Sequence, residues 1–211
     1  MSKFGVRGDQ RVALFIDGPS FYATTRSLGF EVDYRKLLAH FEEECVLYRA
    51  FYFTSMAIDG EEFSPVKPLV DWLGYNGYRI ITKPLKEYTD ATGRRRVKGG
   101  VQVEMAVEML RAAQFCDHIV LFSGEGDLKY VVDAVQQLGV RVTVVSTTAQ
   151  DVTAIADELR RQVDRFVDLE TVKPLIFKRD VVSAPQAQSS SPANGPIMER
   201  RPPSVGIQRR A

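Results

Sequence analysis

Runs of apolar residues alternate with amphipathic stretches along most of this chain. Five short runs are rich in apolar and β-branched residues and end in polar ones: RVALFID (11–17), VLYRAFYFTS (46–55), YRIITKP (78–84), HIVLFSG (118–124) and VRVTVVS (140–146). Runs of this length and composition are typical of buried strands. The pattern also predicts a short final strand at FVDL (166–169).

The stretches between these runs have the 3.6-residue periodicity of helices. Asp33 stands where an N-cap is expected, and Pro65 follows Ser64 as a first helical residue would. Glycines close several of the stretches, as they commonly close helices. The predicted helices cover 19–29, 33–44, 64 to 74 or 77, 101–113, 127–139 and 151–166.

Buried strands that alternate with helices favour an α/β fold, with a mostly parallel sheet covered by helices on both faces. We expect one domain over residues 11–177, preceded by an N-terminal extension of residues 1–10. Residues 178–211 are expected to form a tail, because from about Ser183 the composition is dominated by Ser, Pro, Gln and Ala. Such a segment has few side chains able to build a core, so we expect it to be disordered.

Composition narrows the class of protein. The chain has 211 residues, 45% of them hydrophobic, and a formal net charge of +1, so no overall field favours nucleic acid or membrane. No apolar run is long enough for a membrane span or a signal peptide, which makes a cytoplasmic protein the default expectation. Cys45 and Cys116 lie in apolar surroundings without metal-type spacing, and we interpret them as reduced core thiols.

Acidic residues follow two of the predicted strands. Asp17 ends the first strand, and Glu125 and Asp127 flank Gly126 directly after the fourth. Because the carboxyl ends of parallel strands meet at one edge, these carboxylates should converge there, and they would repel unless a cation lies between them. Oxygen ligands of this kind suit Mg²⁺ or Mn²⁺. A strand-end Asp can also simply cap the next helix, and both interpretations stay open.

The predicted helix 101–113 carries two faces of interest. Val103, Ala106, Val107 and Leu110 share one face, which we expect to pack on the sheet. Glu104 and Glu108 share another face; an acidic surface edge is the commoner fate of such a pair, but Glu104 lies in the first turn, close to the expected strand ends.

A basic segment, TKPLKEYTDATGRRRVKGG (82–100), precedes this helix. Arg95 and Lys98 are its basic residues nearest the helix, and cations beside an acidic metal site could hold phosphates. A charged hairpin without a ligand is an equally good interpretation.

Three blocks of sequence resemble a known family. LFIDGPSFY (14–22), VKGGVQVEMAVEML (97–110) and IVLFSGEGDLKYVVDAVQQLGVRVTVVS (119–146) look like the blocks of the LabA-like NYN domain. The resemblance runs from about Arg11 to Leu169. It implies a PIN-like fold and the activity of a metal-dependent ribonuclease, which cleaves RNA phosphodiesters by a metal-activated water.

The resemblance also implies roles for individual residues. Asp17 would be the first metal-binding acid and Asp127 the last, and Glu104 and Glu125 would complete a set that is both catalytic and metal-binding. The cofactor would be Mg²⁺ or Mn²⁺ and the partner RNA, with no membrane association; a homodimer stays open. Arg95 and Lys98 would then be the RNA-binding residues. The predicted substrate-positioning residues are Ser20, Gln102 and Ser123.

Three positions depart from the family pattern. Ser20 replaces an asparagine, Gln102 replaces an aspartate, and Glu125 replaces an aspartate with a side chain one methylene longer. Gln102 can offer an oxygen ligand but no charge, so metal affinity should fall. The alternative function is therefore a catalytically weakened or inactive RNA-binding or regulatory protein on the same fold.

Overall fold

The computed structural model describes residues 2–56, 65–89, 95–98, 100–149 and 154–180. Its centre is a six-stranded sheet in the order β4-β3-β1-β7-β8-β9, and every neighbouring pair is parallel. The α/β class predicted from the sequence is thereby confirmed. The strands are β1 (Arg11–Asp17), β3 (Val46–Met56), β4 (Tyr78–Pro84), β7 (His118–Phe122), β8 (Arg141–Ser146) and β9 (Arg165–Asp168).

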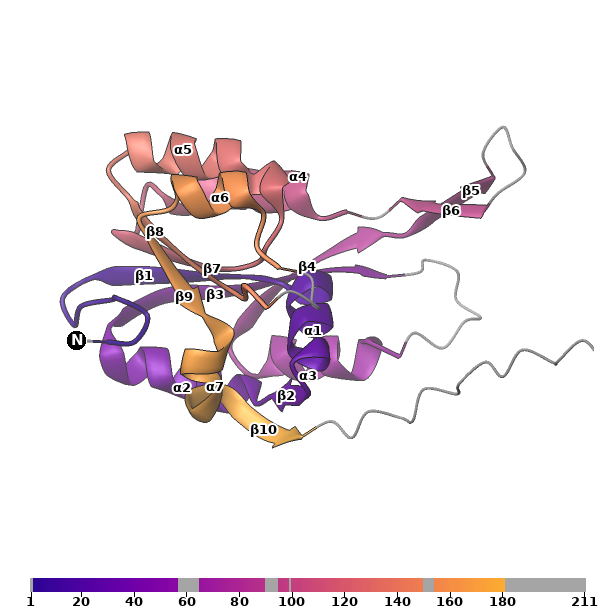
Figure 1. Cartoon of the computed structure of the whole chain (residues 1–211), viewed down its shortest axis with the longest axis horizontal. Helices are drawn as coiled ribbons and strands as arrows, with labels where there is room; N and C mark the ends of the chain where they lie inside the picture. Colours follow the sequence, from indigo (N-terminus) through magenta and orange to yellow (C-terminus); the bar gives the residue numbers. More distant parts are fainter. Residues whose placement is uncertain (1, 57–64, 90–94, 99, 150–153, 181–211) are drawn as a thin grey trace, which may run out of the picture.

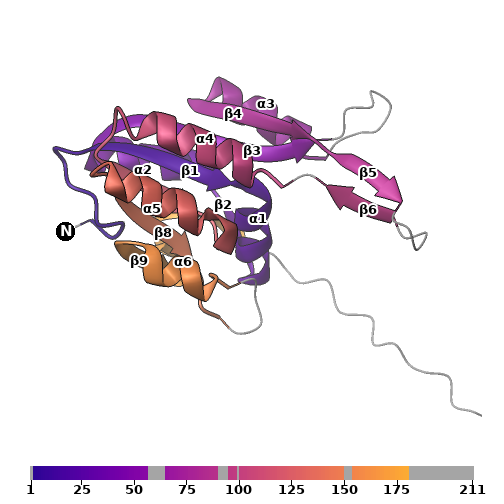
Figure 2. The ribbon, with the colours of Figure 1, turned by 90° about the horizontal axis from the view of Figure 1, so that it is seen from above.

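Helices cover both faces of the sheet, as Figures 1 and 2 show. One face carries α4 (Gln102–Ala112), α5 (Lys129–Gln137) and α6 (Asp157–Gln162), with the short 3₁₀ helix η1 (Gly126–Leu128) leading into α5. The other face carries α1 (Gly18–Ser27), α2 (Tyr34–Glu44), α3 (Lys67–Tyr75) and α7 (Leu169–Ile176).

Two small antiparallel sheets complete the described fold. β2 (Phe30–Val32) pairs with β10 (Phe177–Asp180), and β5 (Lys86–Thr89) pairs with β6 (Arg95–Lys98). The β5–β6 pair extends away from the main sheet beyond the end of β4 (Figures 1 and 2). The basic segment expected before α4 is thus built on a hairpin.

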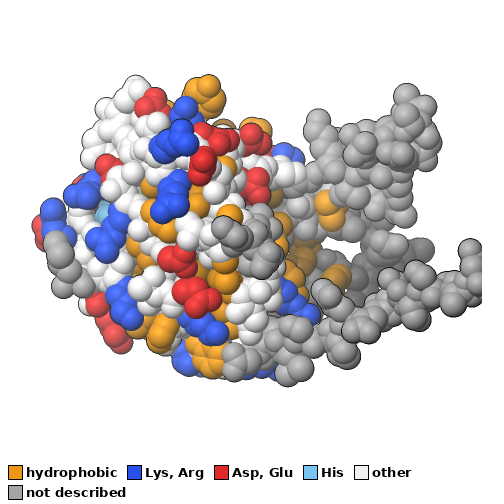
Figure 3. Space-filling view, viewed as in Figure 1, with side chains coloured by type: hydrophobic (Ala, Val, Ile, Leu, Met, Phe, Trp, Pro, Cys, Tyr) orange, Lys and Arg blue, Asp and Glu red, His pale blue; other side chains and the backbone are white. Residues whose placement is uncertain are grey.

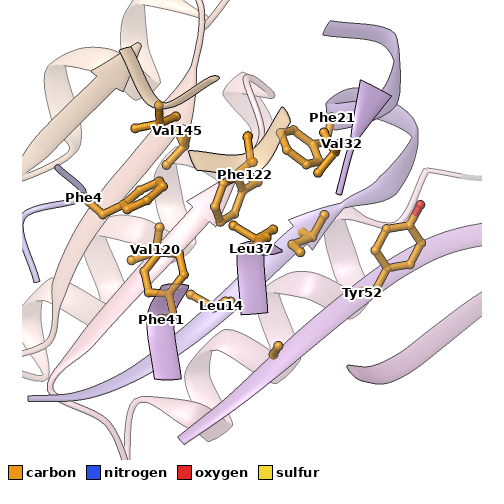
Figure 4. Close-up of a cluster of buried hydrophobic side chains, with 14 of the residues drawn as sticks. Phe4, Leu14, Phe21, Val32, Leu37, Phe41, Tyr52, Val120, Phe122 and Val145 are labelled. Carbon is orange, nitrogen blue, oxygen red and sulfur yellow. The ribbon is translucent and has the colours of Figure 1, made fainter. Parts of the chain in front are cut away.

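Each face of the sheet has its own core. Figure 4 shows the core under α1 and α2, where Phe21, Leu37 and Phe41 pack against side chains of β1, β3 and β7 such as Leu14, Tyr52 and Phe122. On the opposite face Phe15, Phe51 and Phe53 stack under α4, and Val132 and Val135 of α5 are fully buried. The burial on both faces explains why the strands are apolar along their length.

The predicted N-terminal extension belongs to the folded domain. Phe4 and Val6 are buried, and the Phe4 ring lies 4.7 Å from that of Phe41. At the other end the structure continues through β10 to Asp180, past the predicted boundary at residue 177. Isolated apolar residues in short segments have no periodicity, and so the sequence pattern missed both contributions. Residues 181–211 of the tail that was predicted to be disordered lie outside the described residues.

Several predicted helix bounds were wrong. α3 begins at Lys67, two residues after the predicted first helical residue Pro65, with Val66 as its N-cap. α6 is Asp157–Gln162, so residues 154–156 and 163–166 of the predicted helix are not helical. The sequence analysis also missed β2, α7 and β10. α7 contains Pro174, which lacks an N–H and therefore argues against a helix in a sequence pattern.

The predicted inner face of α4 was wrong as well. Met105 and Met109 are completely buried against the sheet, whereas Val103, Val107 and Leu110 are exposed by 67%, 43% and 40%. The helix has apolar residues on two opposite sides, and periodicity alone cannot tell which side meets the sheet.

The surface carries interspersed charges, as Figure 3 shows for one face of the molecule. Cys45 and Cys116 are both buried and free of disulfides, as predicted. None of the helices within the described residues is long and apolar enough to cross a membrane.

Candidate functional site

Asp17 lies where β1 ends and α1 begins. It is the N-cap of α1, and its Oδ1 accepts a hydrogen bond of 3.3 Å from the backbone N–H of Ser20. Gly18 allows this close junction, because a Cβ there would lie 2.6 Å from the Tyr52 hydroxyl and 2.7 Å from the Phe53 carbonyl. The capping role that the sequence offered for Asp17 is thus present.

The second carboxylate oxygen of Asp17 is held by the neighbouring strand. Ser123 follows β7, and its hydroxyl donates to Asp17 Oδ2 over 3.2 Å. The same hydroxyl oxygen accepts a 3.2 Å hydrogen bond from the backbone N–H of Glu125. Ser123 therefore joins the end of β1 to the turn that carries Glu125.

Asp17 is a buried acid. It is 2% exposed, and none of the ion pairs among the described residues includes it. Burial raises the pKa of Asp17 to about 6, against the effect of the hydrogen bonds from Ser20 and Ser123, and the charge of Glu125 adds to the rise. A cation beside Asp17 would reverse this effect.

Asp17 and Glu125 border a pocket of about 260 Å³ at the carboxyl edge of the sheet. Ser20 of α1 and Gln102 of α4 line the same pocket, which places two carboxylates, a hydroxyl and an amide around one space. The described residues that line it are Asp17, Pro19, Ser20, Ser55, Leu85, Gly100, Val101, Gln102 and Glu125. Edges of this kind are the usual ligand sites of parallel α/β sheets.

Glu104, a predicted metal ligand, is engaged elsewhere. Its carboxylate lies 3.0 Å from Nζ of Lys83, which also donates to the carbonyl of Gly100 over 2.7 Å. These two interactions of Lys83 connect the end of β4 with the start of α4. Glu104 does not line the pocket. Glu108 is likewise paired, with Arg111 at 2.8 Å.

Asp127 also lies apart from the pocket lining. It is exposed within η1. Of the predicted metal set, the pocket brings together Asp17 and Glu125, and of the predicted positioning residues it includes Ser20 and Gln102, with Ser123 hydrogen-bonded behind them. Within the described ranges, no group of three or more His, Cys, Asp or Glu side chains is placed to hold a metal ion.

The predicted RNA-binding residues are described only in part. The backbones of Arg95 and Lys98 pair with Thr89 and Lys86 in the β5–β6 hairpin, while their side chains lie outside the described structure. Sequence reasoning missed the role of Lys83 at α4 and the contribution of Ser55 to the pocket. The position of Ser55 near the end of a predicted parallel strand was the available signal.

Comparison with known proteins decides the family. A family model described as the NYN domain matches residues 11–170. The chain belongs to the NYN domain family. The expected resemblance is confirmed over a range close to the one predicted.

This NYN domain is also similar to individual proteins. It is 31% identical over 183 residues to the low amplitude and bright protein LabA of Synechococcus elongatus, an alignment that covers 83% of this chain and 94% of LabA. A crystal structure of a protein of unknown function from Vibrio parahaemolyticus matches with a TM-score of 0.62 and 21% identity, over 78% of this chain and 95% of the other. That likeness concerns the fold alone.

NYN domains are generally ribonucleases, and NYN and PIN-like domains generally depend on divalent metal ions. The pocket of this chain can be compared with that requirement. Mg²⁺ usually keeps several waters and uses only one or two protein carboxylates together with substrate phosphate oxygens. Asp17 and Glu125 supply two carboxylates to the pocket, and among the described residues no cationic side chain pairs with Asp17.

Proposed function

We propose that this NYN domain is a divalent-metal-dependent ribonuclease whose site is the pocket between Asp17 and Glu125. The observation that supports the proposal most is the desolvated Asp17 carboxylate, which borders the pocket beside a second carboxylate and has a raised pKa. The surroundings destabilise the ionised form of this acid. Clusters of acids with shifted pKa values in a pocket are typical of functional sites.

Asp17 and Glu125 would hold the ion, with the Gln102 amide oxygen as a neutral third ligand. A bound Mg²⁺ or Mn²⁺ would supply the positive charge that stabilises the phosphate transition state and promotes ionisation of the attacking water. Glu125 is only partly buried, so its carboxylate can reach both solvent and an ion in the pocket. Ser123 orients Asp17 through its hydrogen bond.

The N-terminus of α4 faces the same pocket. Val101 and Gln102 form the start of this helix, where no side-chain cap hydrogen bond is present among the described residues, whereas the N-terminus of α1 is capped by Asp17. Helix N-termini favour anions because their N–H groups and dipole are positive. A scissile phosphate in the pocket would therefore find backbone donors on one side and the cation-binding acids on the other.

The proposal is tested with a labelled single-stranded RNA. Wild-type protein should cleave it with Mg²⁺ or Mn²⁺ and should stop when EDTA is added. Asp17→Asn and Glu125→Gln should each lose cleavage, while Asp71→Asn, which alters an exposed acid of α3, should match wild type. Equal residual cleavage in wild type and both site variants would indicate a contaminating nuclease and would contradict the proposal.

The second candidate is an RNA-binding protein without cleavage. Two observations favour it: Gln102 brings no charge to the pocket, and Glu104 is paired with Lys83 instead of facing the ion site. Under this alternative the wild type binds the RNA but leaves it intact with either metal, and Gln102→Asp with Glu125→Asp does not create cleavage. If the site is only weakened, the same double variant should cleave faster than wild type.

A further inference from the structure

A second pocket, of about 610 Å³, lies on the α1 and α3 side of the sheet. Its walls come from α1, β2, α3, the start of α2 and β10, which Figure 1 shows close together below the main sheet. Nothing in the predicted metal chemistry uses this pocket. Its lining nevertheless combines aromatic rings with cationic side chains.

The aromatic part of the pocket is accessible. Tyr22 is 56% exposed on α1, and Trp72 of α3 is partly buried, with the Arg35 guanidinium 5.8 Å from its ring centre. Exposed aromatic faces next to arginines are the arrangement on which unpaired bases stack.

The charge of the pocket favours an anion. Arg26, Arg35 and Lys178 line it, and the two acids in its wall are already engaged. Glu31 is held by Arg179 through bonds of 2.8 and 2.9 Å, and Asp33 caps α2 by accepting two backbone N–H bonds. Lys178 also lies 4.0 Å from Glu31, and Arg35 lies over the Trp72 ring. Arg26 is therefore the lining cation that has no ion pair among the described residues and can meet a ligand at the rim.

The helix α1 connects this pocket with the proposed cleavage site. Ser20 lines the first pocket, while Tyr22 and Arg26 line the second. Six helical residues rise only about 9 Å, so a chain of nucleotides that crosses the first pocket can reach the second within a short distance. We infer that the Tyr22–Trp72 pocket is a subsite for an unpaired nucleobase and its phosphate, and that it holds the single-stranded RNA that the neighbouring site acts on.

The inference rests on the proposed function for its substrate, but its test is separate. Trp72 is the only tryptophan of the chain, so its fluorescence reports on this pocket alone. A uridine decamer titrated in EDTA should quench Trp72 saturably, with the same midpoint as fluorescence anisotropy of the labelled RNA. Tyr22→Ala should weaken binding roughly tenfold through lost stacking. Arg26→Ala should also weaken binding and reduce the salt slope by about 0.7.

Matched controls are Tyr75→Ala, which removes a 90% exposed tyrosine at the end of α3, and Arg161→Ala on α6. Both should bind like wild type. The inference is overturned if RNA binds without quenching Trp72, and with equal affinity in Tyr22→Ala and Arg26→Ala. It is also overturned if Trp72 fluorescence changes when residues 181–211 are removed but not when RNA is added. The occupant of the pocket would then be that segment.

Cleavage of the same oligonucleotide with Mn²⁺, measured in parallel, separates the two proposals. Cleavage with no Trp72 response leaves the proposed ribonuclease and removes the subsite. A Trp72 response that depends on Tyr22, without any cleavage, keeps the subsite and removes the ribonuclease.

Discussion

The two sides of the candidate site balance their charges in different ways. On the strand side, Asp17 is buried, accepts hydrogen bonds from Ser20 and Ser123, and has no cationic partner among the described residues. On the α4 side, Gln102 is neutral and Glu104 is held by Lys83. On the strand side, neutral hydrogen-bond donors hold the carboxylate of Asp17, whereas on the α4 side a cation of the chain, Lys83, holds the carboxylate of Glu104.

The largest effect is expected on the strand side. Asp17→Asn should reduce cleavage at least about 100-fold, because the variant removes the desolvated carboxylate that we propose as the main ligand. Asp127→Asn alters an acid that does not line the pocket and should retain much more activity. Cleavage rates of both variants under single-turnover conditions check this difference. Equal losses would mean that η1 moves Asp127 into the site when RNA binds.

Stability should depend on pH through Asp17. Its folded-state pKa is raised from 3.8 to about 6, so between these values the folded protein holds a proton that the unfolded chain has lost. In EDTA, the free energy of unfolding should therefore fall as pH rises through this window, by on the order of 3 kcal/mol from this group.

Asp17→Asn provides the control for that experiment. It should be more stable than wild type at pH 7 and should approach wild type near pH 4. Urea unfolding at both pH values measures the difference, and a constant gap would show that Asp17 is not the titrating group.

A smaller effect is expected when charge is added to the α4 side. Gln102→Asp places a further carboxylate in the pocket, and Mn²⁺ affinity should rise on the order of tenfold, because charge count tunes such sites. Glu104→Gln should leave Mn²⁺ affinity nearly unchanged, since Glu104 is engaged by Lys83. Titration calorimetry compares the two variants. A large loss in Glu104→Gln would show that the Lys83 pair opens to release a ligand.

The smallest effect concerns Lys83 itself. Lys83→Met removes the bonds to Gly100 and Glu104 and should cost about 1 kcal/mol of stability, since the pair is partly buried. Lys67→Met breaks an exposed pair with Asp71 of similar length and should cost close to nothing. Thermal unfolding of the two variants checks the ranking; equal costs would mean that Lys83 contributes no more than a surface pair.

The strand side was the more predictable half of the site. Asp17 and Glu125 follow apolar strands, and parallel pairing brings such strand ends to one edge whatever the packing of the helices. The α4 side depends on which way the helix turns. Its periodicity fitted both the Val103 face and the Met105 face, and only tertiary packing selects the latter.

The sequence pattern could not predict contacts between segments that lie far apart in the chain. Lys83 and Glu104 are separated by 21 positions, and their contact depends on how β4 ends beside α4. The burial of Phe4 similarly depends on a gap between Phe41 and Phe122 that exists only in the folded core.

Mn²⁺ binding measured by electron paramagnetic resonance tests the central claim most directly, because it requires neither the right RNA nor turnover. At pH 7.5 the wild-type chain should bind Mn²⁺ at one site, Asp17→Asn should lose that binding, and Asp71→Asn should keep it. Equal Mn²⁺ binding in wild type and Asp17→Asn, or none in the wild type even with single-stranded RNA present, would contradict the account.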